Sequence, residues 1–116
     1  MVSMLFPTWA YAQTSAYDEL IIQAREGDRQ PLLQYLAVRE KQTQLTAGEI
    51  ADWLQVSSWA NNDVETLAVW DRYRHSMAIP ARGQVAAARA LRNQKQWNAS
   101  LAVWETVLQD EPGNSD

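Results

Sequence analysis

The chain has 116 residues, of which 47% are hydrophobic, no cysteine and a formal net charge of −4 at pH 7. This length suits one small domain, and the lack of cysteine excludes disulfides, thiolate nucleophiles and cysteine-based zinc sites. The acidic balance argues against nucleic-acid binding, which needs clustered lysine and arginine. With only four Gly and four Pro, the composition favours long helices over turn-rich β structure.

Residues 1–12 carry no charge and end in the small-x-small triplet Ala10-Tyr11-Ala12. This triplet is typical of a signal-peptidase site, although the basic region that opens a signal peptide is missing. We interpret the segment as the remnant of a signal peptide, and the alternative is an apolar arm that packs on the first helix. No stretch of the sequence approaches the roughly 20 apolar residues that a membrane-spanning helix needs.

The first helix pair is expected within residues 15–46. Ser15 is the predicted N-cap of its first helix, and Gly27 breaks that helix. Asp28 is predicted to cap the second helix, where Pro31 falls in the first turn and its missing N–H does no harm.

The second helix pair is expected within residues 47–80. Thr46 and Glu49 have the spacing of a capping box, in which each side chain bonds to the backbone of the other residue. Asn61-Asn62 is the predicted turn, and the second helix is expected from about Asp63 through Tyr73.

The third helix pair is expected within residues 81–114. Its first helix carries Val85, Ala88 and Leu91 at helical spacing, and the small Ala88 lets two helices approach closely. Its second helix is expected to end near Pro112, because the residue before a proline resists helical geometry.

One tetrapeptide recurs at a fixed distance and connects these pairs. Leu67-Ala68-Val69-Trp70 returns as Leu101-Ala102-Val103-Trp104, and 104 − 70 = 34, which is the period of the tetratricopeptide repeat, a helix–turn–helix unit. The same step relates three polar turn pairs, at residues 27–28, 61–62 and 95–96. The sequence therefore predicts an all-α tetratricopeptide-repeat solenoid over residues 13–116, with three repeats.

Five segments of the sequence go beyond a generic helical pattern: Ala16-Tyr17-Asp18-Glu19-Leu20-Ile21-Ile22, Ile50-Ala51-Asp52-Trp53-Leu54-Gln55, Arg72-Tyr73-Arg74-His75, Pro80-Ala81-Arg82-Gly83 and Gln96-Trp97-Asn98-Ala99-Ser100-Leu101. These segments resemble one known family, the outer-membrane porins that export the biofilm polysaccharide poly-β-1,6-N-acetyl-D-glucosamine. In that family a periplasmic tetratricopeptide region precedes a C-terminal β-barrel, and this chain resembles the N-terminal part alone. The resemblance implies a periplasmic interaction region that binds the partner deacetylase, the cationic, partly deacetylated polymer, or both.

Catalysis, metals and cofactors find no support in the sequence. The chain has one histidine, His75, and no cysteine, whereas a zinc site needs several nitrogen or sulfur ligands and a catalytic triad needs a nucleophile beside a base. We expect His75 to be a polar residue near a helix C-terminus, where positive charge is stabilising. A sugar hydrolase would need a carboxylate pair that the sequence does not offer, so we predict no enzyme and no cofactor; the alternative is a generic tetratricopeptide adaptor for a peptide or protein partner.

Tryptophan side chains can stack on saccharides. Three of them, however, occupy consensus positions of the predicted repeat and are expected in the core: Trp70, Trp97 and Trp104. Trp53 and Trp59 are less determined and are the candidate ligand contacts, with Asp52 as a candidate partner for a cationic sugar. Neighbouring residues on a helix point in different directions, so Asp52 and Trp53 do not form a pocket by themselves.

Overall fold

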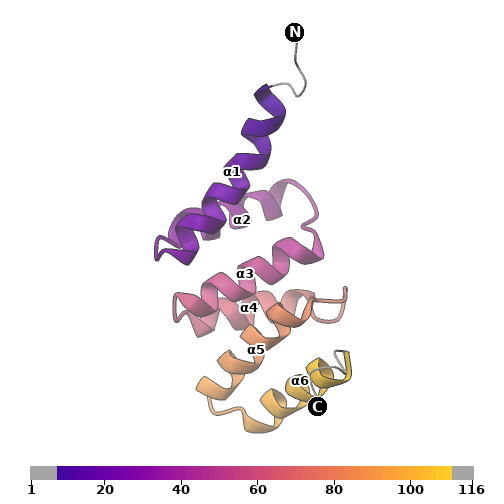
Figure 1. The fold of residues 1–116 in the computed structure, drawn as a ribbon. Helices are drawn as coiled ribbons and strands as arrows, with labels where there is room; N and C mark the ends of the chain where they lie inside the picture. The colour runs from indigo at the N-terminus through magenta and orange to yellow at the C-terminus, as the bar shows by residue number, and fades with distance from the viewer. Residues whose placement is uncertain (1–7, 111–116) are drawn as a thin grey trace.

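The computed structural model describes residues 8–110, with side chains from residue 16 to residue 109, and over this range the fold is all-α (Figure 1). Six helices follow one another and pack as three sequential pairs. Their bounds are α1 Thr8–Arg25, α2 Gln30–Gln42, α3 Ala47–Trp59, α4 Asp63–Tyr73, α5 Ala81–Asn93 and α6 Trp97–Asp110.

The turn inside each pair has the same backbone geometry. Gly27, Asn61 and Lys95, which are spaced 34 residues apart, all have positive φ angles, of 114°, 58° and 64°. In each turn the following amide donates to the carbonyl five residues earlier: Asp28 to Gln23 at 2.8 Å, Asn62 to Ser57 at 2.9 Å and Gln96 to Leu91 at 2.9 Å. A left-handed residue with this hydrogen bond is the Schellman ending of a helix. All three predicted turns are confirmed.

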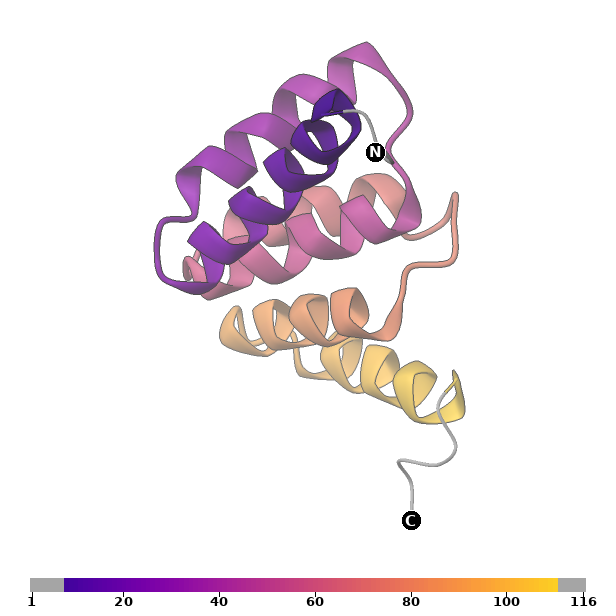
Figure 2. The ribbon, with the colours of Figure 1, turned by 45° about the horizontal axis from the view of Figure 1, so that its top comes forward.

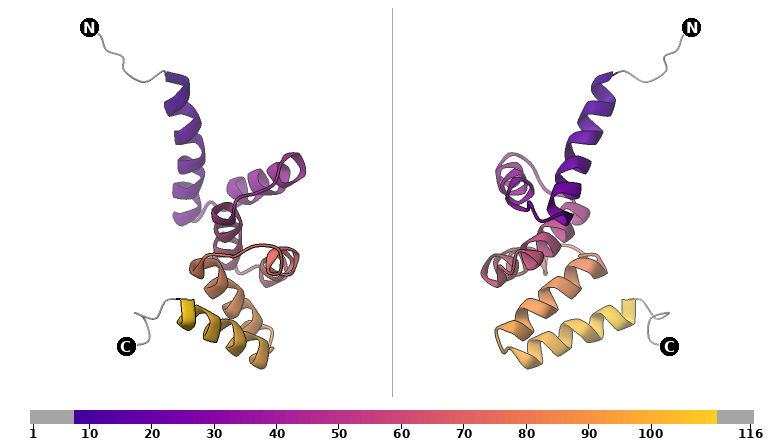
Figure 3. Two further views of the ribbon diagram at one scale, coloured as in Figure 1. Left: turned by 90° about the vertical axis from the view of Figure 1, so that its right-hand side faces the viewer. Right: turned by 60° about the vertical axis from the view of Figure 1, so that its left-hand side comes forward.

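The pairs stack in chain order, as Figure 2 shows. Helix α5 packs on α3, on α4 and on its own partner α6, whereas α2 provides the main contact of the first pair with α3. The start of α1 extends beyond the end of α2 (Figure 3). The core runs along the stack between the pairs, and its largest fully buried apolar side chains are Leu32, Leu36, Ile50, Leu54, Val56 and Val69.

Gly83 lies at a close approach between the second and third pairs. A Cβ atom at this position would lie 3.1 Å from the Ala51 Cα atom, 3.1 Å from Leu54 Cδ1 and 2.8 Å from Ile79 Cγ2. Real Cβ atoms essentially never lie 2.8 Å from another carbon atom and seldom lie at 3.1 Å, so a larger residue here would require its neighbours to shift.

The helix boundaries confirm two predictions and correct two others. The Thr46–Glu49 capping box is present, and α4 spans the predicted Asp63–Tyr73. Helix α1 begins at Thr8 rather than after Ser15, because residues 8–14 contain no Gly or Pro to stop it. The N-cap of α2 is Arg29 rather than Asp28, because the Arg29 carbonyl accepts the first bond of the helix, from the Leu33 amide at 3.2 Å.

The three tryptophans expected in the core differ in burial. Trp70 is 8% exposed and Trp104 packs against the core, but Trp97 is 60% exposed, so that prediction is wrong for Trp97. Exposure also rises along the chain at one equivalent position of the helix pairs: Leu33 in the first pair is 4% exposed, and Leu101 in the third pair is 57% exposed. Helices α2 and α4 are each covered by the next pair, whereas α6 is the last helix that the structure describes.

Of the remaining N-terminal prediction, residues 1–7 lie outside the described range. Within that range, residues 8–12 form the first turns of α1, and the predicted processing after Ala12 stays a prediction.

Candidate functional site

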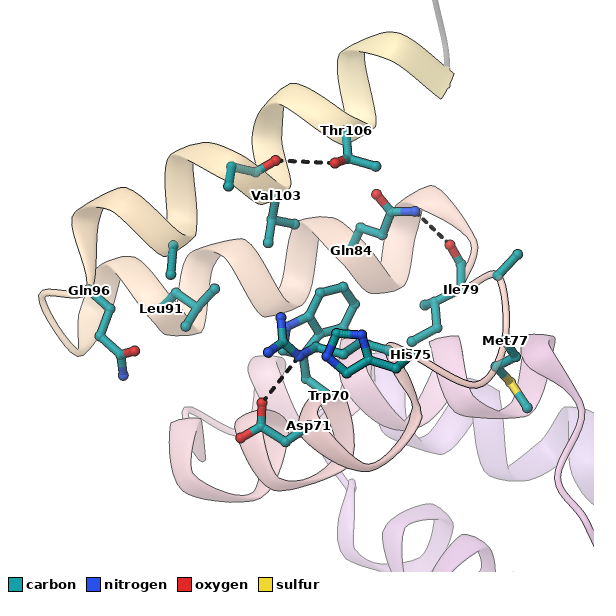
Figure 4. Close-up of a pocket in the computed structure, with 14 residues that line it drawn as sticks. Trp70, Asp71, His75, Met77, Ile79, Gln84, Leu91, Gln96, Val103 and Thr106 are labelled. Carbon is teal, nitrogen blue, oxygen red and sulfur yellow. Dashed lines mark hydrogen bonds and ion pairs between the residues drawn. The ribbon is translucent and has the colours of Figure 1, made fainter.

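A pocket of about 540 Å³ lies between α4, the segment that joins it to α5, and helices α5 and α6 (Figure 4). Its walls are mainly apolar and include Trp70, Ile79, Leu91 and Val103. Helices α4 and α6 belong to neighbouring pairs and do not pack closely on each other, which leaves this space open.

Polar groups lie around the pocket. Arg74 Nε is 3.7 Å from Asp71 Oδ1, and the exposed His75 follows the end of α4, as expected. Gln84 Nε2 donates to the Ile79 carbonyl at 2.8 Å, while Gln84 Oε1 is buried and has no hydrogen-bond partner among the described residues. Nowhere in residues 16–109 do three or more His, Asp or Glu side chains gather closely enough to hold a metal ion.

Asp52, a candidate partner for a cationic sugar, is already engaged by two other helices. The Tyr17 hydroxyl of α1 donates to Asp52 Oδ2 at 2.5 Å, and the Arg82 guanidinium of α5 pairs with Oδ1. We call these three residues the Asp52 clamp, because one carboxylate of α3 connects all three helix pairs. Burial of the tyrosine, and then its hydrogen bond to Asp52, raise the pKa of Tyr17 well above its usual value.

Trp53 lies in the core and is not open to a ligand at the surface. Its side chain is 3% exposed, and its indole Nε1 donates to Glu65 Oε2 at 2.8 Å. The Arg72 guanidinium lies 5.4 Å from the ring centroid, within range of a cation–π interaction. Trp53 therefore connects α3 to α4 inside the second pair.

Trp59 occupies a third, separate place near the turns of the first two pairs. The Arg29 guanidinium donates to its backbone carbonyl, and Arg25, Arg29 and Trp59 line a small hollow of about 260 Å³. The three candidate residues Asp52, Trp53 and Trp59 thus lie at different sites, and the large pocket contains none of them.

A second clamp was not predicted from the sequence. Glu40 of α2 accepts from Arg72 Nε at 3.1 Å, from Arg72 Nη2 at 3.3 Å and from the Tyr73 hydroxyl of α4. Burial, and then the hydrogen bond to Glu40, raise the pKa of Tyr73. We call this set the Glu40 clamp. The partners of both clamps are separated by 30 to 35 residues. A carboxylate about one helix pair away in sequence from an arginine or tyrosine was therefore the signal that could have predicted these contacts.

Comparison with known proteins gives two matches, which carry the same name. The poly-beta-1,6-N-acetyl-D-glucosamine export proteins of Escherichia coli strain K12 and of Escherichia coli O157:H7 are each 44% identical to this chain over 110 residues, which is 95% of the chain. The chain is a homologue of part of this export protein. The chain spans 13% of the length of these relatives. The match confirms the resemblance that the sequence segments indicated.

Other comparisons add nothing to the export-protein homology. No family model matches the chain, and no solved structure matches it significantly. Among the described helices, none combines the length and the apolar character that crossing a bilayer requires.

Proposed function

We propose that the chain is the tetratricopeptide interaction region of a poly-β-1,6-N-acetyl-D-glucosamine export protein, a non-enzymatic part that lies in the periplasm as part of an outer-membrane protein. The observation that carries the proposal is the identity of 44% over 95% of the chain with a protein named for this export. In this proposal the mature region starts after Ala12, and the repeats span residues 15–46, 47–80 and 81–114.

The turn geometry supports the tetratricopeptide assignment. Three helix pairs share one left-handed turn at intervals of 34 residues, which is the repeat length of this architecture. Each pair buries its apolar face against its neighbour, and stability in such arrays comes from the interfaces between adjacent repeats.

Charge supports an interaction of the first two pairs with a cationic polymer. Residues 16–71 contain ten acidic and four basic residues, a net charge of −6. A negative surface attracts the ammonium groups of deacetylated glucosamine units and raises their local concentration. Of the three candidate contacts, Asp52 and Trp53 already have protein partners, so we propose Trp59 as the residue available to a sugar ring. The partner deacetylase is the second ligand that we propose.

Titration of the full chain with β-1,6-linked glucosamine oligomers tests the polymer arm. We expect partly deacetylated oligomers to bind more tightly than fully acetylated ones, and we expect added salt to weaken this binding because ionic strength screens exposed charges. If a folded, helical chain binds neither oligomer, polymer binding is wrong and the deacetylase becomes the ligand to measure. N-terminal sequencing of the exported product tests the periplasmic assignment, since an intact Met1 would contradict processing after Ala12.

A further inference from the structure

Basic residues are concentrated in one part of the chain. Residues 72–104 contain six basic residues and no acidic residue, a net charge of +6, in a chain whose total is −4. The segment includes all of α5, whereas the first two helix pairs are acidic. This separation is stronger than the mixed charges of an ordinary solvated surface.

Helix α5 presents its basic residues on one face. Arg82, Arg89 and Arg92 are all exposed, and the half-buried Val85 lies between them. At 3.6 residues per turn these four positions fall within about 80° of the helix circumference. The opposite side of α5 is buried and consists mainly of small residues: Ala86, Ala87, Ala88 and Ala90. We call Arg82, Val85, Arg89 and Arg92 the α5 basic face.

Among the described residues, only one end of this face forms an ion pair. Arg82 pairs with Asp52 in the clamp described above. At the other end of α5, Asn93 Nδ2 and Gln94 Nε2 bond to the Asp63 carboxylate, at 3.3 and 3.2 Å. Among the residues that the structure describes, neither Arg89 nor Arg92 forms an ion pair.

The adjacent helix does not supply the missing negative charge. The acidic residues of α3 are Glu49 and Asp52, and they pair with Arg39 and Arg82. Two guanidinium groups thus remain available beside the half-buried apolar side chain of Val85. Guanidinium groups recognise carboxylates through two parallel hydrogen bonds.

We propose that the α5 basic face binds an extended acidic segment of a partner protein. From Arg82 to Arg92 the face is about 15 Å long at 1.5 Å per residue, which about five residues of extended peptide cover. Aspartate or glutamate side chains of the segment pair with Arg89 and Arg92, and an apolar side chain contacts Val85. A cationic, deacetylated polymer is repelled here, so this surface is separate from the polymer contact proposed for the first two pairs.

Fluorescence anisotropy with a labelled glutamate-rich peptide of about eight residues tests this proposal on the full chain at low salt. The double variant Arg89→Gln/Arg92→Gln is compared with Arg25→Gln/Lys41→Gln, which removes two exposed basic residues of α1 and α2. Both variants reach the same net charge. We expect the α5 variant to bind at least about tenfold more weakly and the control variant to change affinity less than about twofold, as for lost charge-assisted bonds and for distant charges.

Three results would overturn the proposal. They are no peptide binding by the wild-type chain, equal weakening in the two variants, and equal affinity for polyphosphate of matched charge, which would indicate attraction of any polyanion. Circular dichroism establishes that each variant is folded. This test is independent of the polymer proposal, because Arg89→Gln/Arg92→Gln should leave the binding of glucosamine oligomers unchanged or make it slightly stronger. If the wild-type chain binds the peptide but no glucosamine oligomer, only the polymer proposal is wrong.

Discussion

The two junctions between helix pairs are stabilised in different ways. Where the first pair meets the second, polar side chains carry much of the contact: Tyr17 bonds to Asp52, Glu40 binds Arg72 and Tyr73, and Arg39 pairs with Glu49. Where the second pair meets the third, polar contacts are present too, from Arg82 to Asp52 and from Asn93 and Gln94 to Asp63, but here α5 also approaches the α3 backbone closely at Gly83. Hydrogen bonds and ion pairs therefore contribute to both junctions, and the second junction adds a close approach of two helix backbones.

The difference has consequences for stability. Close packing cannot adjust to an added atom without separating two helices, whereas exposed polar contacts contribute little each and depend on salt and pH. We therefore expect steric changes at the second junction to exceed polar changes at the first, and the following predictions are ordered by the size of the effect.

Gly83→Ala should destabilise the chain most, by about 2 kcal/mol, as expected for overpacking. The new methyl group would collide with the Ala51 backbone at 3.1 Å, although alanine has the better helix propensity. Urea unfolding followed by circular dichroism measures the change. Gly48→Ala in α3 is the matched control, because its nearest neighbours lie 3.9 Å away and it should be neutral or stabilising. Equal effects in the two variants would show that the close approach is not a constraint.

Asp52→Ala should cost about 1–2 kcal/mol, because it leaves the part-buried Tyr17 hydroxyl without its acceptor and releases Arg82. Asp18→Ala, at an exposed position of α1, should change the unfolding free energy by less than about 0.5 kcal/mol. Asp52 contributes to both junctions; if Asp52→Ala destabilised the chain more than Gly83→Ala, the ranking of polar contacts below the close approach at Gly83 would be wrong.

High pH should weaken the first junction selectively. The folded-state pKa values of Tyr17 and Tyr73 are raised, so the folded chain retains these protons above pH 10 while the unfolded chain loses them. This stability is fully present below about pH 10 and declines as the pH rises further. Unfolding between pH 8 and pH 11 should show a steeper loss in wild type than in a Tyr17→Phe/Tyr73→Phe variant. Identical slopes would mean that neither hydroxyl is held as described.

Much of the fold was accessible from the sequence, because the repeat acts through local chemistry. The turns at residues 27, 61 and 95, the capping box at Thr46 and the span of α4 all follow from residue types at fixed spacing. The predicted start of α1 was wrong, because residues 8–14 contain no Gly or Pro and the helix continues through the small-x-small triplet.

The candidate site was less accessible, because it depends on contacts between pairs. Asp52 and Trp53 were separated correctly by their directions on the helix, but their partners Tyr17, Arg82 and Glu65 come from other helices. Trp97 was predicted to lie in the core and is nevertheless exposed, because a position on a helix pair is buried only where a neighbouring pair covers it.

The smallest expected effect concerns the ion pair of Arg39 with Glu49, which joins α2 to α3 at 2.7 Å. Since Arg39 is partly exposed, Arg39→Gln should cost under about 1 kcal/mol at low salt, and this difference from wild type should disappear near 1 M salt as the charges are screened. The matched control is Arg74→Gln, whose partner Asp71 lies 3.7 Å away on the same helix and contributes to neither junction. A cost for Arg39→Gln that persists at high salt would indicate that this contact stabilises through packing, so the first junction would then resemble the second.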